Sequence, residues 1–127
     1  MSVNSGPPTG RMVFVCSPYR ADTATERRAH VNIAVQICRH VLRWGDIPLA
    51  PHLLYPEYGL LNDDDPAERE RGLAINRRWI EQCDALVYYK PKITSGMQVE
   101  LKVARALNKT IHPVGDDLSP IAASLDA

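Results

Sequence analysis

The sequence predicts one α/β domain, a parallel sheet of four to five strands flanked by helices. Short apolar runs alternate along the chain with longer segments in which apolar residues recur at helical spacing. The apolar runs are nearly continuous, which is typical of strands buried on both faces between crossover helices. A length of 127 residues suits a single domain with its own hydrophobic core.

Four apolar runs are predicted to be strands, and turn residues bound them. They comprise residues 12–16, 47–50, 85–89 and 110–114. Pro18 and Pro51 follow the first two runs closely, and proline cannot continue a sheet ladder. With helices between the strands, this order is typical of a small Rossmann-like (flavodoxin-like) fold.

Helices are predicted between the strands. The first begins around residues 23–26 and stops at Gly45, because glycine readily adopts the left-handed conformation of a helix end. The second covers residues 66–82, with Asp65 as its N-cap and Pro66 at its first position. Under this interpretation the acidic run that ends at Asp65 is a solvated turn, and it follows a long loop that is either a lid or a partner contact.

The third helix carries an unusual acidic residue. Ser95 is predicted to be its N-cap, with Gln98 completing a capping box. Its apolar stripe comprises Val99, Val103, Ala104 and Leu107. Glu100 lies in register with this stripe, and an inward carboxylate costs free energy unless it is paired or used. Two explanations stay open, an inward salt bridge and a site in which Glu100 takes part in chemistry.

Composition excludes several classes of function. The formal net charge is zero, so no basic excess favours nucleic acid or an anionic membrane surface as a partner. No long apolar run or signal peptide is present, and we expect a cytoplasmic protein. The cysteines and histidines lack metal-ligand spacing, and neither GxGxxG nor a Walker A pattern occurs, so we expect no metal and no cofactor. Residues 1–10 are expected to be a disordered leader, and residues 11–127 the single domain.

The loops that follow the strands are the expected binding site, because ligands of parallel sheets bind at the carboxyl ends of the strands. Arg20 could clamp a phosphate or carboxylate. Thr94, Ser95 and Gly96 form a hydroxyl-rich turn at a helix start, where free N–H groups favour anions. Tyrosines for stacking are Tyr19, Tyr55 and Tyr58. Such a pocket suits a nucleoside monophosphate.

Three segments carry a resemblance to a known family: VFVCSPYR, CDALVYY and SGMQVELKVARALNKTIHPV. They resemble the nucleoside 2-deoxyribosyltransferase superfamily, which includes the nucleoside 5'-monophosphate N-glycosidases and small uncharacterised relatives. The resemblance covers roughly residues 12–114. It implies that Glu100 is the nucleophile that attacks C1' of the sugar, and that Asp84 handles the base or the sugar. Thr94, six residues before the glutamate, and Arg20 would contact the phosphate.

The resemblance implies cleavage or exchange of the base of a (deoxy)ribonucleoside 5'-monophosphate, or of a nucleoside, by a homodimer or larger homo-oligomer. The expected substrate-binding residues are Ser17, Tyr19, Arg20, His52, Thr94, Ser95 and Gly96. The chain departs from the family where CSPYR replaces a glycine-rich loop and Gln98 replaces a glycine. The alternative is therefore a non-catalytic nucleotide-binding module, a sensor or a sequestering protein. A third, weaker hypothesis is a structural or regulatory interaction domain.

Overall fold

The computed structural model describes residues 10–117, so the predicted leader and the end of the chain lie almost wholly outside the described residues. A four-stranded parallel sheet has the order β2-β1-β3-β4. The strands are β1 (Met12–Cys16), β2 (Ile47–Leu49), β3 (Ala85–Tyr89) and β4 (Thr110–Val114). The predicted α/β class, a flavodoxin-like parallel sheet flanked by helices, is confirmed.

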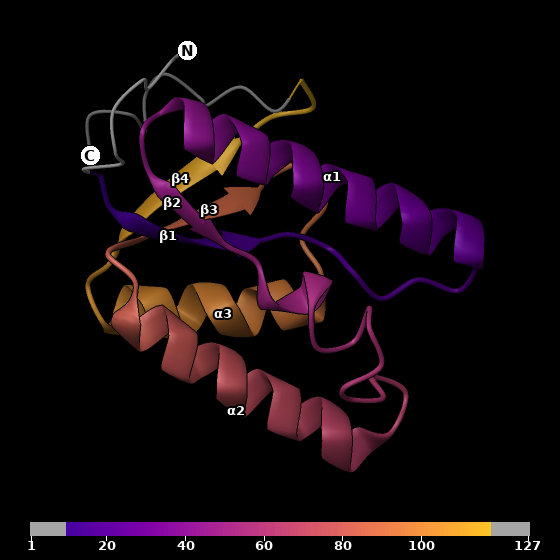
Figure 1. Ribbon diagram of the computed structural model, residues 1–127. Helices are drawn as coiled ribbons and strands as arrows, with labels where there is room; N and C mark the ends of the chain where they lie inside the picture. Colours follow the sequence, from indigo (N-terminus) through magenta and orange to yellow (C-terminus); the bar gives the residue numbers. More distant parts are fainter. Residues whose placement is uncertain (1–9, 118–127) are drawn as a thin grey trace.

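Helices cover both faces of this sheet (Figure 1). They are α1 (Ala24–Arg43), α2 (Pro66–Gln82) and α3 (Ser95–Ala106), with the short 3₁₀ helix η1 (Pro51–Leu53) after β2. Figure 1 shows α1 on one face and the pair α2 and α3 on the other. No helix within residues 10–117 has the length and apolar content needed to cross a bilayer.

Alternation along β1 explains why both faces are covered. Val13 and Val15 pack into one apolar cluster with residues of α1, whereas Phe14 and Cys16 pack into a second cluster with residues of α2 and α3. All four side chains have 0% exposure. Successive side chains of a strand point to opposite faces, and fully burying one such aliphatic or aromatic side chain stabilises the fold by about 1.5–3 kcal/mol.

The predicted ends of the first two helices agree with the structure. The Thr23 hydroxyl accepts a 3.1 Å hydrogen bond from the Glu26 N–H at the start of α1. Asp65 caps α2 by accepting from the Ala67 N–H at 2.9 Å, and Pro66 is the first helical residue. Gly45, just after α1, has a φ of 85°, a conformation that favours glycine.

The start of α3 differs from the prediction by one residue. Thr94, not Ser95, is the N-cap, and its hydroxyl accepts from the Met97 N–H at 3.2 Å. The buried residues are Met97, Leu101 and Ala104. The predicted stripe was wrong at two positions, because Val99 is 44% and Leu107 is 37% exposed. This helix has apolar residues on more than one side, so spacing alone did not select the buried side.

Candidate active site

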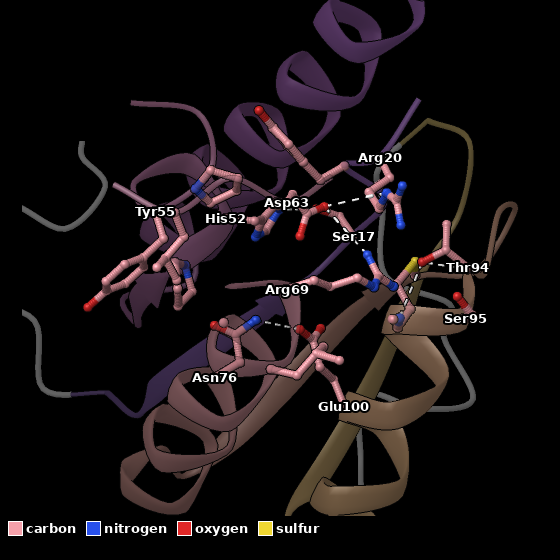
Figure 2. Close-up of a pocket in the computed structure, with 18 of the residues that line it drawn as sticks. Ser17, Arg20, His52, Tyr55, Asp63, Arg69, Asn76, Thr94, Ser95 and Glu100 are labelled. Carbon is pink, nitrogen blue, oxygen red and sulfur yellow. Dashed lines mark hydrogen bonds and ion pairs between the residues drawn. The ribbon is translucent and has the colours of Figure 1, made fainter. Parts of the chain in front are cut away.

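A cavity of about 430 Å³ lies at the carboxyl ends of the central strands. The strand order reverses between β1 and β3, so the connections that follow these strands leave in opposite directions and open a crevice between them. The loop after β1, η1 and its following loop, the first half of α2, and the start of α3 form the walls (Figure 2). This volume is within the range of small-molecule sites, about 300–1,000 Å³.

The cavity brings together the predicted catalytic and substrate-binding residues, with one exception. Those that line it are Ser17, Tyr19, Arg20, His52, Thr94, Ser95, Gly96 and Glu100. The exception is Asp84, which lies at the amino end of β3. There its carboxylate accepts a 2.8 Å hydrogen bond from the Met12 N–H at the start of β1. A five-residue strand, about 3.3 Å per residue, separates Asp84 from the cavity, so the structure does not place Asp84 where it could handle the base or the sugar, as the resemblance implied.

Glu100 occupies the wall of the cavity that α3 contributes, and its side chain is half-buried. Asn76 on α2 donates a 2.8 Å hydrogen bond from Nδ2 to Oε2 of Glu100 (Figure 2). Burial raises the pKa of Glu100 to about 7, although contacts with Cys16 and Asn76 and the charge of Arg69 act in the opposite direction. No lysine or arginine among the described residues forms an ion pair with it. The first of the two explanations, an inward salt bridge, is therefore not observed among residues 10–117.

Two helix N-terminal N–H groups face the cavity region near Thr94. Ser95 and Gly96 are the first residues of α3, and their N–H groups have no hydrogen-bond partner among the described residues. The Thr94 oxygen is used as the cap acceptor, which leaves its O–H free to donate. A helix start with free donors attracts anions.

Ser17 and His52 form a polar pair on the opposite side of the cavity. The Ser17 Oγ lies 2.7 Å from the His52 Nε2. Burial lowers the pKa of His52 to about 4, so the imidazole is neutral at pH 7. The Tyr19 ring stands edge-on to it, with centroids 6.4 Å apart. These groups offer hydrogen bonds and ring contacts to a ligand in the cavity.

The loops after β1 and β3 are tied together by a buried histidine. His30 Nδ1 lies 3.1 Å from the Tyr19 carbonyl oxygen, and its Nε2 lies 2.9 Å from the Lys92 Nζ. A carbonyl can only accept and an ammonium can only donate, so the ring proton lies on Nδ1. Lys92 also donates to Glu26 at 3.0 Å. This chain of contacts fixes both loops at the edge of the cavity.

Two side chains of α2 that the sequence analysis missed are part of the site. Arg69 and Asn76 line the cavity together with Gly72 and Leu73. These four positions have the spacing of one helix face, i, i+3, i+4 and i+7. Polar residues on a face that is expected to be inward were the signal that could have identified them.

The predicted roles of the long loop need two corrections. Tyr58 is 77% exposed and does not line the cavity, although Tyr19 and Tyr55 do. The acidic run is more than a solvated turn, because Asp63 pairs with Arg69 at 3.5 Å and with Arg20 at 3.7 Å. Arg20 lines the cavity as predicted, but its guanidinium group already pairs with the carboxylates of Asp63 and Asp64.

No group of three or more His, Cys, Asp or Glu side chains within residues 10–117 is arranged to hold a metal ion. Burial raises the pKa of the Cys16, Cys38 and Cys83 thiols, which keeps them protonated and unreactive at neutral pH. The side chains that line the cavity include carboxyl groups, an imidazole, hydroxyls and guanidinium groups.

Comparison with known proteins gives a family and a fold. The family model described as Domain of unknown function (DUF7768) matches residues 11–114. Comparison with curated proteins gives no significant match. Among solved structures, the chain is similar to the 2-deoxyribosyltransferase of the psychrotolerant bacterium Bacillus psychrosaccharolyticus, described as a biocatalyst for the synthesis of antiviral and antitumoral nucleosides. The TM-score is 0.54 at 19% identity, over 82% of this chain and 72% of that one, which is a likeness of fold.

Proposed function

The chain belongs to the DUF7768 family, and we propose that it cleaves the N-glycosidic bond, or exchanges the base, of a (deoxy)ribonucleoside 5'-monophosphate. The observation that carries this proposal is the position of Glu100. Its carboxyl group borders a cavity of small-molecule size, about 430 Å³, and has a neutral hydrogen-bond donor rather than an ion-pair partner. The fold that it shares with a 2-deoxyribosyltransferase supports a nucleoside ligand.

Glu100 is the proposed nucleophile. Cleavage of an N-glycosidic bond passes through an oxocarbenium-like state, which a carboxylate stabilises or captures. The ionised Glu100 oxygen forms a bond to C1' as the C1'–N bond breaks, and the base leaves with the bonding electron pair and takes a proton from water. A water molecule, or a ring nitrogen of a second base, then attacks C1', and the C1'–Glu100 bond breaks with its electron pair on the carboxylate. The attacking group gives its proton to the hydroxide left by the first step. Because the pKa of Glu100 is raised to about 7, about half of the molecules carry the ionised form at neutral pH.

The remaining residues of the cavity would bind the substrate. Thr94, Ser95 and Gly96 present a hydroxyl and free N–H groups to the 5'-phosphate, and Arg20 provides a positive charge. The other binding residues, which contact the sugar and the base, are Ser17, His52, Tyr19 and Tyr55. Asp84 has no part in this proposal, because it lies at the amino ends of the strands, opposite the cavity.

A test of this proposal measures base release. Purified protein is incubated with a panel of nucleosides and nucleoside 5'-monophosphates, and free base is separated by chromatography. Glu100→Gln should lower the rate at least about a thousandfold, as expected for removal of a nucleophile. Glu70→Gln is the matched control, because Glu70 is exposed on α2 and does not line the cavity. Equal rates in the Glu100→Gln variant and the unsubstituted protein would exclude the mechanism.

The alternative is a nucleotide-binding module without catalysis. One observation favours it: the loop after β1, residues 17–20, contains no glycine and includes Pro18, so its backbone cannot approach a ligand as closely as a glycine-rich loop. A module of this kind gains thermal stability from a nucleotide without turnover. A ligand at about 100 times its Kd adds roughly 2.7 kcal/mol.

Assembly into a homodimer or larger oligomer remains part of the proposal. The loop before α2 exposes large apolar side chains, since Leu54 is 48%, Tyr58 77% and Leu60 58% exposed. Burial of these side chains between subunits would stabilise an oligomer. Sedimentation velocity of the protein and of a Tyr58→Ser, Leu60→Ser double variant tests this, and a monomer at all concentrations would exclude it.

A further inference from the structure

One carboxylate oxygen faces two arginines at the mouth of the cavity. Asp63 Oδ2 lies 3.5 Å from Arg69 Nη1 and 3.7 Å from Arg20 Nε. Figure 2 shows dashed lines from the Asp63 carboxylate to both guanidinium groups, which come from α2 and from the loop after β1. Close pairs between a guanidinium and a carboxylate measure about 2.7–2.9 Å. Both contacts are therefore longer than a close ion pair, and Arg20 makes a second contact of this kind, with Asp64 at 3.5 Å.

The two arginines stand at the site proposed for the phosphate. Arg69 Nη2 lies 3.5 Å from the point that a Cβ of Gly96 would occupy, so this guanidinium is beside the first turn of α3. The Arg69 side chain is only 24% exposed, whereas that of Arg20 is 51% exposed. The site thus has an inner and an outer cation, with free N–H groups of α3 next to the inner one.

The Asp63 side chain is not needed to hold its own loop. The Asn62 N–H donates to Glu68 at 2.7 Å, and Asn62 in turn accepts from the N–H groups of Asp64 and Asp65. Asp65 caps α2 through its own carboxylate. None of these contacts uses the Asp63 carboxylate, so that group can leave the arginines while the turn stays folded.

We infer that the Asp63 carboxylate and the substrate phosphate compete for Arg69 and Arg20, with Asp63 acting as a tethered anion that the phosphate displaces. This inference rests on the proposed function and names Arg69 as the inner phosphate-binding residue and Asp63 as a specificity-determining one. A phosphate monoester has three terminal oxygens and nearly two negative charges at pH 7. It can reach both guanidinium groups at short distance, whereas Asp63 offers them one oxygen. A neutral nucleoside cannot displace Asp63, so this arrangement selects against it.

The chain offers a matched pair of variants for the test. Asp63→Asn and Asp64→Asn each remove one negative charge from adjacent positions. Asp64 is 76% exposed and contacts Arg20 at 3.5 Å, and it forms no ion pair with Arg69. Calorimetric titration of the full chain with inorganic phosphate, and separately with ribose 5-phosphate, needs no knowledge of the base. The two probes also distinguish a site for free phosphate from a site for a sugar phosphate.

For Asp63→Asn we expect a Kd for ribose 5-phosphate about tenfold lower than that of the unsubstituted chain, and for Asp64→Asn a change below about threefold, since exposed pairs contribute little. Adding Arg69→Gln to Asp63→Asn should abolish the gain. Circular dichroism checks that each variant is folded. Tighter binding of inorganic phosphate but not of ribose 5-phosphate would overturn the assignment to a sugar phosphate.

Two further results would overturn the inference. Equal tightening in Asp63→Asn and Asp64→Asn would mean that only overall charge matters, and unchanged or weaker binding in Asp63→Asn would mean that Asp63 does not compete. These outcomes are independent of catalysis. If no base is released but Asp63→Asn still binds ribose 5-phosphate more tightly, the proposed reaction is excluded and the phosphate site remains. If base is released but Asp63→Asn does not bind more tightly, the proposed reaction remains and the competition is excluded.

Discussion

The side-chain amide of Asn76 on α2 donates a 2.8 Å hydrogen bond to Glu100 on α3, across 24 residues of sequence. The donor is neutral, so it fixes the orientation of the carboxyl group without cancelling its charge. Burial meanwhile raises the pKa of Glu100 to about 7. The pair thus holds a carboxyl group that is ready to ionise near neutral pH, at the edge of a cavity, which is typical of functional sites.

Asn76→Asp should impair activity through the charge of Glu100. Two carboxyl groups at hydrogen-bond distance share one proton, and the second ionisation moves to higher pH. We expect kcat at pH 7 to fall by at least about tenfold and to recover partly at higher pH. Profiles of kcat against pH for the variant and the unsubstituted protein measure this. Superimposable profiles would mean that Asn76 does not control the ionisation of Glu100.

The pH dependence of the unsubstituted protein follows from the same raised pKa. If the ionised form of Glu100 is the nucleophile, kcat/KM should rise between pH 5 and pH 8 with a midpoint at about 7. His52 adds no inflection in this interval, because its pKa is lowered to about 4. An activity midpoint near the ordinary glutamate pKa of 4.5 would contradict this assignment.

Glu100→Gln should stabilise the fold at high pH while it removes activity. The pKa of Glu100 is about 7 when folded against 4.5 for the free group, so folding favours the protonated form. Stability from this group is complete below pH 4.5, falls as the pH rises, and is lost above pH 7. The loss is at most about 3 kcal/mol.

Urea denaturation at pH 4 and at pH 8 checks this prediction. The Glu100→Gln variant should equal the unsubstituted protein at pH 4 and exceed it by about 1–3 kcal/mol at pH 8. Glu70→Gln, on the exposed side of α2, should show no such pH-dependent difference. If the Glu100→Gln variant is less stable than the unsubstituted protein at pH 8, the pKa of Glu100 is not raised by burial.

Asp84→Asn separates a structural role from a chemical one. The Asp84 carboxylate accepts a 2.8 Å hydrogen bond from the Met12 N–H at the amino ends of the strands, far from the cavity. We expect a loss of about 0.5–1.5 kcal/mol in unfolding free energy with kcat/KM within twofold of the unsubstituted value, about experimental error. A large fall in kcat with unchanged unfolding free energy would indicate that Asp84 takes part in the reaction.

Thr94→Ala and Ser95→Ala distinguish the observed N-cap from the predicted one. Thr94 accepts the cap hydrogen bond from Met97, whereas Ser95 is already the first helical residue. Thr94→Ala should lower the unfolding free energy by about 1 kcal/mol, and Ser95→Ala should change it little. Thermal unfolding of the two variants gives the comparison, and a larger loss for Ser95→Ala would favour the original assignment.

The order of strands and helices was determined by the sequence alone. Strands buried on both faces appear as short continuous apolar runs, and helices buried on one side show apolar residues at helical spacing, and both patterns are local. The Asp65-Pro66 start of α2 and the stop at Gly45 were likewise local, since a cap or a left-handed residue depends on its immediate neighbours. Spacing also placed Glu100 on the inward side of α3, although two members of the stripe with which it is in register, Val99 and Leu107, are exposed. The rule that ligands gather at carboxyl ends of strands already opposed Asp84, which precedes β3; the family resemblance, not the pattern, had suggested it.

Only the tertiary structure decided what surrounds Glu100. The contact with Asn76 and the meeting of Asp63, Arg69 and Arg20 join segments that are far apart in the chain. Spacing identified the buried side of α3 only in part, and it does not show which residue of another helix lies opposite. Arg69 lines the cavity and also pairs with Asp63 of the acidic loop. This arrangement and the raised pKa of Glu100 depend on distances and burial that exist only once α2 and α3 pack together.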